Sequence, residues 1–149
     1  MAENDTPQKS VTLTRIYVKD CSFESPRSPE VFASPMDPEL QVSMRSAAKK
    51  IEGDEVEVVL TITVEASSEG RSLFLAEVHQ AGTFTVTGFV DLEEKAVLGS
   101  YCPSILFPYA REVISSLATK GGMPTLLLQP VNFDAVFAQS LAAEAGAAK

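Results

Sequence analysis

The stretch LGSYCPSILFPYAREVISSLATKGGMPTLLLQPVNFDAVF, residues 98–137, decides how this chain folds. Near Ser104 its apolar residues begin to recur at intervals of three and four, which predicts a helix of about fifteen residues. Gly121-Gly122 is expected to end that helix, and an extended apolar arm follows from Met123 to Pro130. Asn132 is placed to cap a final helix. The stretch therefore predicts two helices joined by an arm.

The chain before this stretch has the alternating pattern of β-strands. In EVEVVLTITVEA, residues 55–66, apolar and polar side chains alternate, which is typical of a strand covered on one face. Similar patterns predict strands at 10–23, with both faces partly covered or a bulge, at 40–48, and at 72–87, with a bulge or bend at Gly82. The prediction is an α+β fold: a four-stranded antiparallel sheet with a long crossing loop after its first strand, a long helix and a C-terminal helix.

The remaining segments carry weaker signals. Asp91-Leu-Glu-Glu94 has the spacing of a capping box, which predicts a short helix beginning at Asp91. Cys102-Pro103 is expected to break that helix before the long one begins. We expect residues 1–9 to be disordered, residues 10–142 to form one domain and residues 143–149 to be a flexible tail.

Composition argues against several function classes. The net charge is −8 and the pI about 4.6, which disfavours nucleic acid and suits a basic partner. No apolar run approaches the ~18 residues of a membrane span, so direct membrane insertion is not expected. The chain has two cysteines, no CxxC motif and a single histidine, His79, so no metal site and no cofactor are predicted. The small number of cysteines favours a reducing cytoplasm. No catalytic motif is present in the sequence, so an enzyme is not expected.

The sequence also has more apolar strand positions than one sheet face and one helix can bury. Ile16, Val18, Leu73 and Leu75 lie at alternate positions from the main apolar faces. For a small protein in water, self-association is the usual way to bury such a surplus. The competing hypothesis is a two-layer monomer.

Three segments, RIYVKDCSFESP (15–26), LGSYCPSILFPYARE (98–112) and PVNFDAVF (130–137), closely resemble the SecB family. The resemblance spans about residues 10–142. It implies an ATP-independent chaperone of the bacterial cytoplasm, a homotetramer built as a dimer of dimers. Such a chaperone holds unfolded precursors of exported proteins and delivers them to the translocation motor SecA. The alternatives are a SecB-like chaperone or scaffold dedicated to one partner, such as an antitoxin, and a small-molecule-binding or enzymatic domain.

The resemblance further implies three sets of site residues, and each set also has a purely structural explanation. The SecA-facing acidic patch of the family matches Asp20, Glu24, Leu75 and Glu77, which otherwise form a solvated strand face. The client groove matches Phe32, Met36, Leu40, Val42, Met44, Phe137 and Leu141, which otherwise are ordinary core. The helix at the oligomer interface matches Leu106, Tyr109, Val113 and Leu117.

Overall fold

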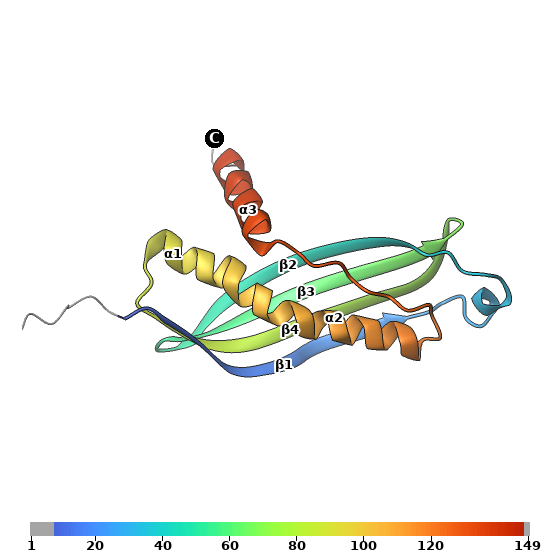
Figure 1. Cartoon of the computed structure of the whole chain (residues 1–149), viewed down its shortest axis with the longest axis horizontal. Helices are drawn as coiled ribbons and strands as arrows, with labels where there is room; N and C mark the ends of the chain where they lie inside the picture. The colour runs from blue at the N-terminus through green and yellow to red at the C-terminus, as the bar shows by residue number, and fades with distance from the viewer. Residues whose placement is uncertain (1–7, 148–149) are drawn as a thin grey trace, which may run out of the picture.

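The computed structural model describes residues 8–147 and contains the predicted antiparallel sheet of four strands. The spatial order is β1-β4-β3-β2, so β1 and β2 form the two edges (Figure 1). The strands are β1 (Ser10–Glu24), β2 (Glu39–Glu52), β3 (Glu55–Ser68) and β4 (Arg71–Thr87). β2 continues past the predicted end at Ala48, because its pairing with β3 runs unshifted to Lys50 and resumes at Glu52 after a shift of register.

Two tight turns join the three strands β2, β3 and β4. Gly53 begins the turn between β2 and β3 with φ +58°. Glu69 and Gly70 join β3 to β4 with φ of +51° and +74°. Two successive positive φ angles give the turn type whose twist matches that of antiparallel strands.

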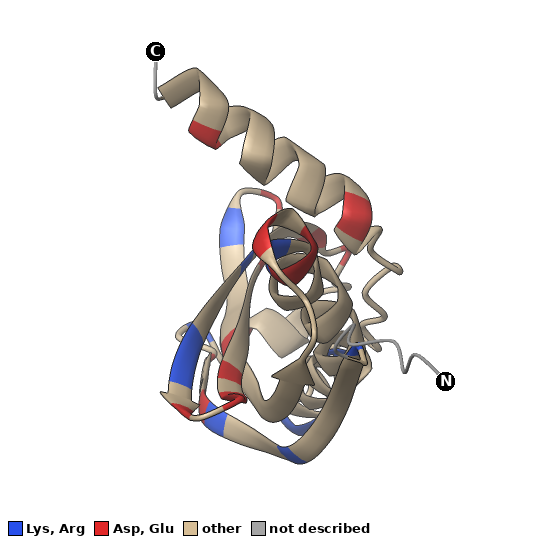
Figure 2. Ribbon diagram, turned by 90° about the vertical axis from the view of Figure 1, so that its left-hand side faces the viewer, with Lys and Arg blue, Asp and Glu red and all other residues tan. Residues whose placement is uncertain are grey.

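The core lies between the sheet and one long helix, α2 (Cys102–Lys120). Figure 2 shows the sheet end-on, with the helices on one face, here called the inner face. The fully buried side chains come from alternate residues of β3 and β4 and from every third or fourth residue of α2. They include Val58, Leu60, Ile62, Val64, Val78, Phe84, Leu106 and Ile114.

β1 contains the bulge that was one of the two alternatives predicted for residues 10–23. Its register against β4 shifts between Leu13 and Arg15, and again between Val18 and Asp20. The predicted bulge at Gly82 is wrong, because neither of its pairings shifts there, and the alternative of a bend stays a prediction. A Cβ on Gly82 would instead lie 3.0 Å from Leu106 Cδ2. Gly82 therefore allows α2 to lie close to the sheet.

We expect Gly82→Val to lower the free energy of unfolding by about 1–3 kcal/mol, because the added side chain must displace the fully buried Leu106. Urea unfolding followed by circular dichroism measures this change. Ala47→Val, at an exposed strand position, is the control and should stay within about 0.5 kcal/mol of the unchanged protein. Equal stability of the two variants would contradict the close approach of helix and sheet.

The long helix begins earlier than predicted. α1 (Asp91–Ala96), the π-helical turn η2 (Val97–Tyr101) and α2 follow one another without interruption. The predicted break at Cys102-Pro103 is therefore wrong. The π turn, in which the Cys102 N–H donates to the Val97 carbonyl, is wide enough to take Pro103 in the first turn of α2.

The predicted capping box at Asp91 is also wrong. The residue in the N-cap position is Val90, which has no side-chain group to accept a hydrogen bond. Asp91 lies inside the helix with φ +53°, a conformation that aspartate tolerates better than most residues.

The end of α2 and the arm agree with the sequence. Gly122 has φ +75°, and the Met123 N–H donates to the Ala118 carbonyl at 3.0 Å, which closes the helix. The arm runs back along α2, fixed by a 2.7 Å hydrogen bond from Ser115 Oγ to the Leu126 carbonyl. Leu126 and Leu128 are buried, whereas Leu127 between them is 67% exposed.

The arm ends at the second predicted helix, α3 (Phe133–Ala147), which projects away from the sheet (Figure 1). Asn132 Oδ1 accepts the N–H of Ala135 at 3.1 Å, so the predicted cap is confirmed. The helix continues past Ala142, through most of the segment expected to be a flexible tail. At the other end Lys9 forms a 2.6 Å ion pair with Glu93, while residues 1–7 lie outside the described residues.

Within residues 8–147, no helix is long and apolar enough to cross a membrane.

Candidate functional site

The four residues predicted for the acidic patch lie together on the outer face of the sheet, the face without helices. Leu75 of β4 is paired with Glu24 of β1, and Glu77 is paired with Ser22. Asp20 is paired with His79, two residues further along β4. Directly paired residues of antiparallel strands point to the same face, as do alternate residues of one strand. Asp20, Glu24, Leu75 and Glu77 are called the acidic patch below.

Glu77 is the best-fixed carboxylate of the acidic patch. Its Oε1 accepts a 2.9 Å hydrogen bond from Thr63 Oγ1, and its Oε2 lies 3.5 Å from His79 Nε2. The Thr63 hydrogen bond, more than the nearby His79 and Arg45, lowers the pKa of Glu77 below its ordinary value. Glu77 is therefore charged over a wide pH range and held in one position.

Leu75 gives the acidic patch an apolar centre. Its side chain is 37% exposed, an unusual amount for a leucine in a central strand. Glu24 lies beside it on β1, and Glu65 lies beside it on β3. The sequence prediction did not include Glu65, although Glu65 belongs to the polar face of the alternating segment 55–66.

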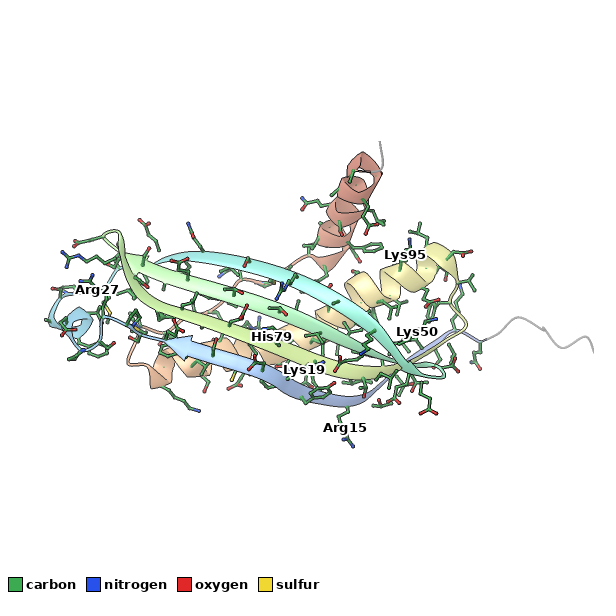
Figure 3. All side chains as sticks on the ribbon, turned by 180° about the vertical axis from the view of Figure 1, so that it is seen from behind. Arg15, Lys19, Arg27, Lys50, His79 and Lys95 are labelled. Carbon is green, nitrogen blue, oxygen red and sulfur yellow. The ribbon has the colours of Figure 1, made fainter. Side chains whose placement is uncertain are left out.

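The charge on the outer face changes sign next to the acidic patch. Figure 3 shows His79 and Lys19 close together on neighbouring strands of this face. Arg45 of β2 is paired with Thr61 of β3, which in turn is paired with His79. A hollow of about 340 Å³ lies here, lined by Lys19, Arg45 and His79 around Ala47 and Val59.

Lys19 is held in place by a cluster that joins β1 to β3. Its Nζ lies 2.8 Å from Glu57 Oε1, and the Tyr17 hydroxyl donates to Glu57 Oε2. The hydrogen bonds from Lys19 and Tyr17 lower the pKa of Glu57. Burial, reinforced by the Glu57 carboxylate, raises the pKa of Tyr17 to about 12. The cluster connects the edge strand β1 to β3 and holds the charged end of Lys19 beside the acidic patch.

The residues predicted for the client groove lie at separate places within this chain. Leu40, Val42 and Met44 lie on the inner face of β2, paired with Ala66, Val64 and Ile62. Val42 is 44% exposed and Leu40 39%, because β2 is an edge that α2 does not cover. Along this edge the arm runs between β2 and α2 (Figure 1). These three β2 residues are called the apolar track.

The other predicted groove residues lie at opposite ends of the molecule. Phe32 belongs to η1 (Glu30–Ala33) in the crossing loop, and its ring lies against Gly122 at the end of α2. Met36 lines a separate cavity with Leu73 and Arg71. Phe137 packs against Gly99 in η2, far from the crossing loop. Leu141, one helical turn beyond Phe137, is half-buried on α3.

The long helix places its four predicted interface residues in different environments. Leu106 is fully buried against the sheet, so it belongs to the core of this chain. Tyr109 is 49% exposed, and Val113 and Leu117 are half-buried. Only the last three residues offer surface to a second copy. Periodicity identified the apolar face of the helix, but it did not separate the residues that pack on the sheet from those that stay exposed.

Within residues 8–147 there is no group of three or more His, Cys, Asp and Glu side chains placed to hold a metal ion. His79 lies on the outer face of the sheet, hydrogen-bonded to Thr61 across 3.4 Å.

Comparison with known proteins shows the family of this chain. The model of the family described as preprotein translocase subunit SecB matches residues 4–144. This chain belongs to the SecB family. A protein-export protein SecB of Alcanivorax borkumensis is 50% identical over 139 residues, covering 91% of this chain and 88% of that protein. One of Hahella chejuensis is 47% identical over 143 residues, covering 95% and 90%.

A solved structure supports the fold. The SecB-like chaperone Rv1957 of Mycobacterium tuberculosis, in complex with a ChAD peptide from the HigA1 antitoxin, superposes with a TM-score of 0.63. It is 15% identical and covers 81% of this chain and 90% of its own. The predicted family, the predicted fold and the role of a SecB chaperone in protein export are confirmed.

Proposed function

We propose that this SecB chain is an ATP-independent holdase of the bacterial cytoplasm, which binds unfolded precursors and delivers them to SecA. One observation carries this proposal: two chemically different surfaces lie on opposite faces of one sheet. The apolar track lies on the inner face, at the β2 edge. The acidic patch lies on the outer face. A client and a delivery partner can therefore be bound at the same time.

The acidic patch suits a basic segment of SecA. Its carboxylates attract cations over a distance, and Leu75 offers apolar contact once a segment has docked. The aliphatic part of a lysine or arginine side chain can lie on Leu75 while its charged end reaches Glu24 or Glu77. The same patch would repel acidic clients.

The apolar track suits extended, unfolded segments. β2 is an edge strand, so an added strand can hydrogen-bond to its backbone without regard to sequence. Alternate side chains of that strand would then meet Leu40, Val42 and Met44. The flexible thioether of Met44 can adapt to side chains of different shape. Folded proteins lack free extended segments and would not be bound.

The proposed assembly is a homotetramer, a dimer of dimers. Large apolar side chains are exposed on the continuous helix formed by α1, η2 and α2, among them Leu92, Tyr101 and Tyr109. A second copy packed against this helix would cover them, and exposed apolar surface of this kind commonly marks an interface.

Size-exclusion chromatography with light scattering tests the proposed function. The chain weighs 16.0 kDa, and we expect a mass near four times that value. An unfolded precursor should increase the mass, and the same precursor after folding should not. A monomer that is indifferent to unfolded protein would overturn both the holdase and the tetramer.

A further inference from the structure

Two hollows lie side by side on the outer face, and Arg45 and Thr61 line both of them. The first, of about 230 Å³, opens toward the acidic patch and is lined by Ser43, Thr63 and Glu77. We call it the patch-side hollow. The second is the hollow of about 340 Å³ beside Lys19, called the Lys19-side hollow. Arg45 therefore stands at the boundary between an acidic and a basic site.

The patch-side hollow has the chemistry of a seat for a cation. Glu77 accepts a hydrogen bond from Thr63 and retains further acceptor capacity on both carboxylate oxygens. The hydroxyl oxygens of Ser43 and Thr63 are additional acceptors for an ammonium or guanidinium group. A lysine or arginine of a segment docked on the acidic patch fits here.

The Lys19-side hollow has the opposite chemistry. Its floor is apolar, from Ala47 and Val59, and its walls carry the cationic side chains of Lys19 and Arg45. Lys19 is already paired with Glu57, whereas Arg45 forms no ion pair with any residue in 8–147. A glutamate side chain matches both features, because its methylene groups can cover the floor and its carboxylate can meet the Arg45 guanidinium.

We propose that the basic segment that docks on the acidic patch also carries a glutamate, that Arg45 binds this glutamate in the Lys19-side hollow, and that this contact fixes the register of the segment on the sheet. The inference rests on the proposed docking of SecA. Thr63 and Val59, which line one hollow each, are four residues apart on β3, or roughly 13 Å at ~3.3 Å per residue. In an extended segment the basic residue and the glutamate would therefore be about four residues apart.

Three synthetic peptides test the role of Arg45. Each has a block of lysines followed, four residues later, by glutamate, glutamine or lysine. Fluorescence anisotropy at low salt measures their binding to the full chain. We expect the glutamate peptide to bind about threefold more tightly than the glutamine peptide, as an exposed ion pair allows. The lysine peptide should bind most weakly, although it has the highest positive charge.

The variant Arg45→Glu should reverse this order. It makes the outer face more acidic, so simple attraction predicts tighter binding of every basic peptide. The proposed contact predicts weaker binding of the glutamate peptide and tighter binding of the lysine peptide. Lys50→Glu, on the same strand but the inner face, is the matched control and should preserve the order of the three peptides.

The outcomes separate this inference from the proposed function. If the unchanged protein binds SecA and prefers the lysine peptide, Arg45 is only a repulsive boundary and the inference is wrong. The same conclusion follows if Arg45→Glu binds the glutamate peptide as tightly as the unchanged protein does. If the unchanged protein binds neither SecA nor any peptide, the docking of SecA is overturned and the inference with it.

Discussion

Glu77→Lys is expected to abolish SecA binding and to leave the holding of clients intact. Glu77 is fixed by Thr63 beside the exposed Leu75, at the centre of the outer face. The substitution removes an attraction for a basic segment and adds a repulsion, and like charges in contact cost several kcal/mol. We expect the affinity for SecA to fall at least about tenfold. Titration of SecA by calorimetry measures the first effect, and prevention of precursor aggregation measures the second.

Glu52→Lys is the matched control for this experiment. It makes the same change of charge at the turn between β2 and β3, away from the acidic patch, and it should leave both activities nearly unchanged. If Glu77→Lys lost client holding together with SecA binding, the two surfaces would not be separate sites. If it kept SecA binding, SecA would dock elsewhere.

Val42→Lys is expected to produce the opposite loss, with client holding weakened at least about tenfold and SecA binding preserved. Val42 is the centre of the apolar track and 44% exposed, so a lysine there interrupts the contact with apolar client segments at little cost to folding. Anisotropy of a labelled, unfolded precursor measures the change. Circular dichroism verifies that the variant is folded.

Gln41→Lys is the control for client holding. It adds the same charge on the next residue of β2, whose side chain points to the outer face. Client holding should therefore be retained. An equal loss in both variants would show that charge, and not the apolar track, controls the binding of clients.

Alternation predicted the two faces of β3 and of most of β4. It was wrong for Leu73, which the sequence placed on the same face as Leu75: Leu73 is the extra residue at a register shift and is buried in the core. The covered face of β3 is continuous from Val56 to Ala66, so the sheet and its two faces could be predicted from one segment. Alternation also predicts that Leu75 and Glu77 of the acidic patch share one face, because they are alternate residues of β4. Backbone signals such as Gly122 and Asn132 were equally reliable, since each has one common structural use.

Glu65 could not have been placed beside Leu75 from the sequence. Counting back from the turn at Glu69-Gly70 pairs Glu65 with Phe74, which points into the core. A shift of register between Ala66 and Ser67 adds one residue to β4 and brings Leu75 opposite Glu65. No residue type in the sequence near Ala66 and Ser67 predicts this shift of register.

Signals with two common uses produced the errors. A glycine inside a strand marks either a bulge or a close neighbour, and at Gly82 the neighbour is Leu106. A proline after a short helix usually ends it, yet the π turn before Pro103 lets the helix continue. The separation of Phe32 from Phe137 could not be predicted, because the path of the arm that lies between them leaves no periodic pattern in the sequence.

The alternation of faces along β4 constrains how this sequence can change over evolution. Leu75 and Glu77 face outward, while the residues that follow each of them, Ala76 and Val78, are fully buried. Neither pairing of β4 shifts between Leu75 and His79, so one residue inserted after Leu75, without a bulge to absorb it, would place Glu77 in the core and Val78 at the surface. A substitution in this regularly paired part of β4 keeps the remaining residues on their faces, whereas a change in its length does not. Natural variation in length is therefore expected to be concentrated in the crossing loop and beyond α2, where no second face depends on the count.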